Sequence, residues 1–126
     1  MYYSISMFLK LGHNKLDAYT IARQFITDCY KVVGRFHADE KYILIQQTKH
    51  AALSVHLNIA EGSSRRSDLE RKGFYEISRG SIIEIDAALD IAADLGYCSA
   101  DELQDLGGSL VNCFKYITGL INANSS

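Results

Sequence analysis

The sequence predicts an all-α fold, an antiparallel up-down-up-down four-helix bundle. Two observations support this fold class. The 126-residue chain contains no proline, the residue that most strongly interrupts helices and marks turns, and four long segments repeat apolar residues every three or four positions. Apolar residues make up 48% of the chain, so a domain of this length can form one hydrophobic core. Four such helices joined by short turns pack most simply with neighbours antiparallel.

Three regions are expected: an N-terminal arm at residues 1–13, the bundle at 14–122 and a polar tail at 123–126. The arm is rich in apolar and aromatic residues but has no helical period. It is either an arm that packs on a neighbouring subunit or a frayed terminus. It lacks the basic start and cleavage site of a signal peptide, and no apolar run approaches the ~20 residues that span a bilayer. We therefore expect a cytoplasmic protein.

The first two helices are predicted at about residues 14–35 and 39–61. Asn14 and Asp39 are good N-cap residues, because their side chains can accept hydrogen bonds from free N–H groups of the first turn. In each segment the apolar residues gather on one face. Gly62 follows the second helix, where a glycine in the left-handed conformation commonly ends a helix.

The third helix is predicted at about residues 67–95. Ser67 followed three residues later by Glu70 is the signature of a capping box. The expected buried stripe consists of Leu69, Phe74, Ile77, Ser81, Ile85, Ala88, Ile91, Ala92 and Leu95. Gly73 and Gly80 lie inside the segment, where each costs up to ~1 kcal/mol of helix propensity. We expect close helix packing to explain them.

The fourth helix is predicted at about residues 100–122, after a turn with clear signals. Gly96 is expected to end the third helix, with Tyr97 folding back as its hydrophobic contact. Ser99 and Glu102 form a second capping box. The expected core stripe consists of Leu103, Leu106, Leu110, Cys113, Ile117, Leu120 and Ile121.

The net charge of −2 gives no overall attraction to nucleic acid or anionic lipid. The charge is uneven: residues 1–35 carry five basic and two acidic groups, whereas residues 87–126 carry one basic and five acidic groups. Such asymmetry can steer self-association or a basic partner, and a solvated surface without that role is the alternative. Cys29, Cys98 and Cys113 are odd in number and far apart, which fits packing roles in a reducing compartment.

No combination of residues indicates catalysis, a cofactor or a metal. No histidine lies three residues after a glutamate, the spacing of di-iron sites in helical bundles, and HExxH and the Walker phosphate loop are absent. No base is expected beside a serine or cysteine nucleophile. We expect a protein that is not an enzyme, without catalytic, cofactor-binding or metal-binding residues.

Five polar residues lie on or beside the predicted buried faces of the second and third helices: Asn58, Glu61, Arg65, Ser81 and Glu84. A buried glutamate needs a partner, and arginine suits it. We expect Glu61 to pair with Arg65 or with the start of the third helix, and Asn58 to bond to Ser81 or Glu84. The set is interpreted as a structural network that fixes helix register, with a polar pocket or partner site as the alternative.

A basic cluster at the turn between the second and third helices offers a different interpretation. Arg65, Arg66 and Lys72 are placed to contact phosphates at one end of the bundle. Three acidic residues between positions 68 and 76 are interleaved with them, so a salt-bridged surface is the alternative.

Several motifs resemble a known family. They are SVHLNIAEG at 54–62, then Arg65, GSIIEI at 80–85 and AADLGY at 92–97. Together they resemble the bacterial four-helix bundle proteins encoded in intervening sequences of 23S rRNA genes, over about residues 14–121. The resemblance implies ring-forming homo-oligomers, with a pentamer suspected, and supplies no catalytic residues. It also implies a relation to the accessory variability protein of diversity-generating retroelements, which binds nucleic acid and a reverse transcriptase.

Two features depart from that family. His37 stands where its members usually have proline, and the chain is slightly acidic where the retroelement relative is strongly basic. The expected function is therefore a non-enzymatic, homo-oligomeric binding or scaffold protein with no membrane partner. The alternative is an RNA- or DNA-binding accessory protein that uses a basic rim around Arg65, Arg66 and Lys72.

Overall fold

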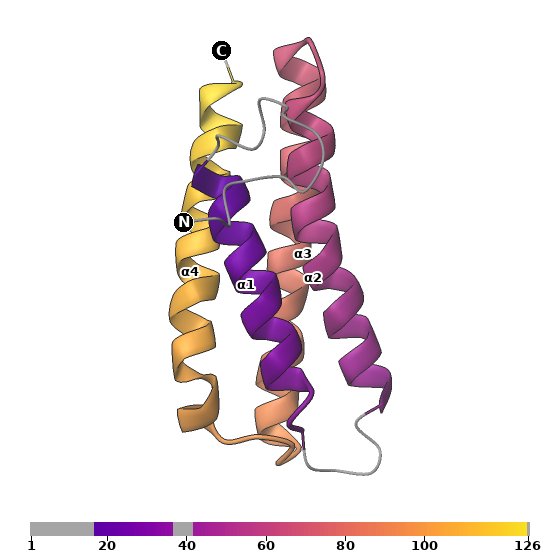
Figure 1. Cartoon of the computed structure of the whole chain (residues 1–126), viewed down its shortest axis with the longest axis vertical. Coiled ribbons are helices and arrows are strands. Elements are labelled where there is room, and N and C mark those ends of the chain that lie inside the picture. Colours follow the sequence, from indigo (N-terminus) through magenta and orange to yellow (C-terminus); the bar gives the residue numbers. More distant parts are fainter. Residues whose placement is uncertain (1–16, 37–41, 126) are drawn as a thin grey trace.

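The structure, a computed structural model, describes residues 17–36 and 42–125. These residues form four α-helices and no strand: α1 (Asp17–Val33), α2 (Tyr42–Ser63), α3 (Asp68–Asp94) and α4 (Ala100–Ala123) (Figure 1). The predicted all-α class with four helices is therefore confirmed for the described part of the chain. None of these four helices combines the length and apolar character needed to cross a membrane.

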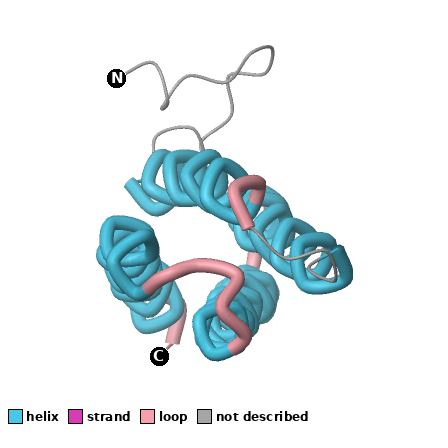
Figure 2. Tube along the Cα trace, turned by 90° about the horizontal axis from the view of Figure 1, so that it is seen from below, coloured by secondary structure: helices cyan, strands magenta, loops and turns pink. Residues whose placement is uncertain are grey.

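Each helix packs against two others. α1 contacts α2 and α4, and α3 contacts the same two helices. In Figure 1, α1 ends and α2 begins at the lower end, where α3 also ends and α4 begins. The turn from α2 to α3 lies at the upper end. Seen from below, the four helices surround one common core (Figure 2).

The core takes one stripe of side chains from each helix. Its largest fully buried members are Phe25, Ile59, Ile82, Ile85 and Ile117. The stripe predicted for the fourth helix is confirmed at its buried members, and Leu103 and Leu120 of that stripe are partly buried against the core. The residues buried on α4 are Leu106, Leu110, Cys113, Ile117 and Ile121.

The inward face of α3 differs from the prediction. Its buried residues are Tyr75, Ser78, Ile82, Ile85, Leu89 and Ala92. Of the predicted stripe, Ile85 and Ala92 are buried, whereas Ile77 and Leu95 are more than half exposed. α3 carries two apolar faces, and the one built on Tyr75, Ile82 and Leu89 enters the core. The helical period of apolar residues alone could not show which of the two faces of α3 is buried.

Gly62 does not have the predicted left-handed conformation. It is a buried residue inside α2, and Gly96, with φ 77°, is the one described residue with a positive φ. A Cβ atom at Gly62 would lie 2.9 Å from both Phe74 Cβ and Tyr75 Cε1. Gly62 therefore allows α2 to approach α3 closely. The packing role expected of Gly73 and Gly80 is wrong, because a Cβ at either would have no neighbour within 4 Å.

The helix ends predicted at Ser67, Gly96 and Ser99 are present in the structure. Ser99 and Glu102 form a complete capping box. Ser67 caps α3, but Glu70 returns its carboxylate to the Ser67 hydroxyl rather than to the Ser67 N–H. Gly96 ends α3: its N–H donates to the Ala93 carbonyl, and the next N–H donates to the Ala92 carbonyl.

Other expected boundaries move or fall outside the structure. Tyr97 folds back as predicted, is buried, and places its ring 6.1 Å from that of Phe36. The caps Asn14 and Asp39 lie outside the described residues. Ala123 belongs to α4 and Asn124 caps it, so the predicted polar tail begins later than residue 123.

Replacing Gly62 by alanine tests the close approach of α2 to α3. Overpacking a tight contact costs about 1–3 kcal/mol, more than the ~1 kcal/mol of helix propensity that alanine gains. We expect urea denaturation to show a lower free energy of unfolding for Gly62→Ala. Gly108→Ala is the matched control, because a Cβ there meets nothing within 4 Å, and it should be neutral or stabilising. Equal effects would contradict the role assigned to Gly62.

Candidate interaction surface

The structure forms the predicted pair between Glu61 and Arg65. Arg65 Nη2 donates to Glu61 Oε2 at 2.7 Å, and the guanidinium lies over the Phe74 ring, 4.8 Å from its centroid. The Glu61 side chain is 50% exposed, however, so the expectation that it is buried is wrong. An exposed pair of this kind contributes only about 0–1 kcal/mol.

The bond predicted between Asn58 and Ser81 or Glu84 is replaced by a different arrangement. Asn58 Nδ2 donates to the backbone oxygen and the hydroxyl of Ser54, at 2.9 and 3.0 Å. The Ser81 hydroxyl donates to the same Ser54 hydroxyl at 2.9 Å. Glu84 accepts a bond of 2.6 Å from Gln47 Nε2. The five predicted polar residues are thus not one network.

These bonds define a polar α2–α3 seam, made of Gln47, Ser54, Ser81 and Glu84. Deeper between the same helices, the fully buried Ser78 hydroxyl donates to the Val55 carbonyl at 2.7 Å. Sequence reasoning missed Gln47, Ser54 and Ser78 as members of this contact. The sequence feature that could have indicated them is the recurrence of small or polar residues on both helices. Pairing these residues also requires knowing how α3 is rotated about its axis.

Beside the seam, α2 and α3 expose a row of large apolar side chains. We call it the outer α2–α3 face, made of Leu53, Leu57, Ile77, Ile91 and Leu95, which are 44–59% exposed. Leu57 lies one turn from Ser54 and Ile77 lies one turn from Ser81. Because Ser54 and Ser81 contact each other, Leu57 and Ile77 flank the same stretch of the seam. Three residues of the stripe predicted to be the α3 core, Ile77, Ile91 and Leu95, lie on this face.

Arg71, which neighbours the basic cluster in sequence, is occupied by contacts within the chain. Arg71 Nε donates to Asn124 Oδ1 at 2.8 Å, and its Nη1 donates to the carbonyls of Arg65 and Arg66 at 2.9 and 2.8 Å. Arg71 also pairs with Asp68. It therefore joins the α2–α3 turn to the end of α4, a role that the sequence did not reveal.

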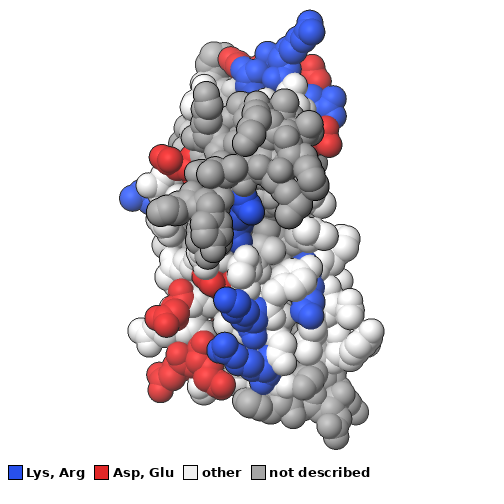
Figure 3. Space-filling model, in the orientation of Figure 1, with Lys and Arg blue, Asp and Glu red and all other residues white. Residues whose placement is uncertain are grey.

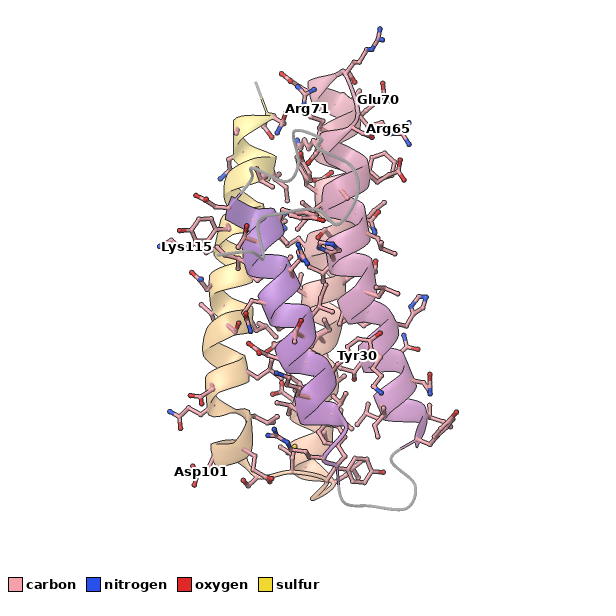
Figure 4. All side chains as sticks on the ribbon, viewed as in Figure 1. Tyr30, Arg65, Glu70, Arg71, Asp101 and Lys115 are labelled. Atoms are coloured by element: carbon pink, nitrogen blue, oxygen red, sulfur yellow. The ribbon has the colours of Figure 1, made fainter. Side chains whose placement is uncertain are left out.

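Charges of both signs meet at this end of the bundle. Figure 3 shows basic and acidic side chains side by side at the upper end, and Figure 4 places Arg65, Glu70 and Arg71 there. Arg66 is exposed and Lys72 is partly buried. Of the three residues predicted to contact phosphate, Arg65 is already paired with Glu61. The upper end is therefore a surface of mixed sign.

The three cysteines have raised pKa values. Burial raises the pKa of the Cys29 and Cys113 thiols to about 12, and the Asp28 carboxylate adds to the effect at Cys29. Burial and then Glu102 raise the pKa of Cys98. Protonated thiols are poor nucleophiles. Across residues 17–36 and 42–125, no three His, Cys, Asp or Glu side chains are grouped to hold a metal ion.

Residues 14–119 match the family model described as 23S rRNA-intervening sequence protein. The matched range includes the α2–α3 seam and the whole outer α2–α3 face. The family resemblance of the sequence motifs is thereby confirmed. No curated protein matches the chain.

Arg71→Lys should destabilise the fold. Lysine cannot reproduce the fork of donors that reaches two carbonyls and Asn124 at once, and hydrogen bonds of a charged group contribute about 1.5–3 kcal/mol. We expect a lower melting temperature by calorimetry. Arg66→Lys, at an exposed position in the same turn, is the matched control and should melt like the wild type. An unchanged Arg71→Lys protein would disprove the clamp.

Raising the pH from 8 to 10 should lower stability through the buried cysteines. Their pKa values are higher in the fold than the ordinary 9.0, so their contribution is complete below about pH 9 and is lost as the pH rises toward 12. Urea midpoints at the two pH values measure the loss. The Cys113→Ala variant should lose less over this interval than the wild type, and an equal loss would contradict the assignment.

Proposed function

The chain belongs to the 23S rRNA-intervening sequence protein family, and we propose that it is a non-enzymatic, homo-oligomeric binding or scaffold protein. In this proposal the subunit is an antiparallel up-down-up-down four-helix bundle, and copies associate through the outer α2–α3 face. One observation carries the proposal: three large apolar residues of α3, Ile77, Ile91 and Leu95, lie outside its core stripe and are exposed on the subunit.

A helix with apolar residues on opposite sides suits burial on both sides. On α3, Ile82 is fully buried while Ile77 and Ile91 are at least half exposed. On α2, Val55 is buried while Leu53 and Leu57, two positions away on either side, are exposed. Contiguous exposed apolar groups of this kind mark protein contacts more often than free surface.

A second copy of the chain is the partner that this surface fits best. The subunit also exposes Ile83, Val111 and Phe114 on α3 and α4, so each copy has a second apolar surface that can receive a different segment of its neighbour. Unlike surfaces that pair head to tail close into rings when the rotation permits. The pentamer suggested by the family resemblance is one such ring. The three free, buried cysteines support a reducing compartment such as the cytoplasm.

The nucleic-acid alternative has weaker support. It needs Arg65, Arg66 and Lys72 to be available, but Arg65 is paired with Glu61, and acidic side chains lie beside basic ones at this end of the bundle (Figure 3). Binding through these groups would weaken steeply with salt. Retention of structured RNA at low salt that is lost in an Arg66→Ala, Lys72→Ala double variant would favour this alternative instead.

Ile77→Asp should break the assembly. A carboxylate on the outer α2–α3 face must lose its water when a second copy covers it. We expect at least tenfold weaker association, which corresponds to ~1.4 kcal/mol, measured as a fall in mass by light scattering. Asn112→Asp introduces the same charge on the exposed part of α4 and should keep the wild-type mass. A monomeric wild type at micromolar concentration would reject the proposal.

A further inference from the structure

An apolar groove lies between α3 and α4, away from the α2–α3 seam. Its lining residues are Ile82, Ile83, Asp86, Leu110, Val111 and Phe114, and its volume is about 330 Å³. The side chains of Ile82 and Leu110 are buried and form the floor, whereas Ile83 and Val111 are 56% and 65% exposed and form the walls. The groove is therefore apolar inside, with one carboxylate at its edge.

One end of the groove is held in shape by a cation. The Arg79 guanidinium lies 5.8 Å from the centroid of the Phe114 ring, and Arg79 Nη1 donates to the Thr118 hydroxyl at 3.3 Å. These contacts join α3 to α4 and fix the aromatic wall. Asp86 places negative charge at the groove edge, and Asp90 lies one turn further along α3.

Residues 1–13 have the composition that such a groove would accept. Eight of the thirteen are apolar or aromatic, Lys10 is basic, and none is acidic. In an extended chain Tyr3, Ile5 and Met7 point to one side. Apolar side chains on one side fit the floor and walls, and a cation fits the carboxylate edge.

The arm is long enough to reach another subunit. Thirteen extended residues span up to about 45 Å, and the 27-residue α3 is about 40 Å long. Within one subunit, α4 lies between α1 and α3, because α1 packs on α2 and α4 rather than against the groove. The outer side of α4 carries Lys115 (Figure 4), and a basic side chain there is unfavourable for a segment that contains a lysine. An arm that binds the groove of a second copy does not have to pass over α4 of its own subunit.

We infer that residues 1–13 of one copy bind in the α3–α4 groove of a neighbouring copy. The inference rests on the proposed homo-oligomer and names a contact within it. The apolar side of the arm covers Ile83, Val111 and Phe114, and Lys10 lies near Asp86 or Asp90. The arm thereby ties together subunits that associate through the outer α2–α3 face.

Disulfide cross-linking between two full-length chains tests this contact. One chain carries Met7→Cys, the other carries Val111→Cys, and the two are mixed and oxidised. The native cysteines are all buried. We expect a disulfide-linked dimer of the two different chains on a non-reducing gel. Asn112→Cys, one residue along α4, is the matched control and should cross-link at least fivefold less. Equal yields from the two positions would overturn the inference.

Charge and subunit size complete the test. Asp86→Lys in the Val111→Cys chain should slow cross-linking about two- to fivefold, the effect of an exposed ion pair, and an unchanged rate overturns the assigned polarity of the groove. A Met7→Cys, Val111→Cys double variant that links only within one chain overturns exchange between copies. Light scattering separates the two proposals: a monomeric wild type rejects the oligomer, whereas an oligomer without the cross-link rejects the arm alone.

Discussion

The rest of the structure depends on the close approach of α2 to α3 at Gly62. No side chain larger than a hydrogen atom fits there without displacing Phe74 or Tyr75. That contact brings the Ser78 hydroxyl to the Val55 carbonyl and the Ser54 and Ser81 hydroxyls to each other. Small residues on both helices thus bring the two backbones together, and a buried hydroxyl is satisfied by a carbonyl of the facing helix.

This contact also fixes how α3 is rotated about its axis. With Tyr75 and Ser78 turned toward α2, Ile82 and Leu89 enter the core, and Ile77, Ile91 and Leu95 are left outside. The exposed apolar face is therefore not an accident of composition at single positions. Helix α3 has two apolar sides, and the other helices of the subunit cover only one of them. The uncovered side is the basis of the proposed assembly.

The polar residues at the α2–α3 turn serve mainly to hold helices in place. Arg71 binds two carbonyls of the turn and Asn124 beyond α4, and Arg65 is engaged by Glu61 and Phe74. Two of the basic residues at this turn, Arg65 and Arg71, therefore make their contacts with groups of the same chain.

The sequence by itself determined the four helices, the capping roles of Ser99 and Glu102, the turn at Gly96 and the family, because each depends on residues a few positions apart. Helix α4 has one apolar stripe, so its buried face was also predictable. Only the tertiary structure decided which stripe of α3 enters the core, why position 62 is glycine, and what Ser54 and Arg71 bind. Those outcomes depend on distances between residues far apart in the chain, and helical periodicity carries no information about them.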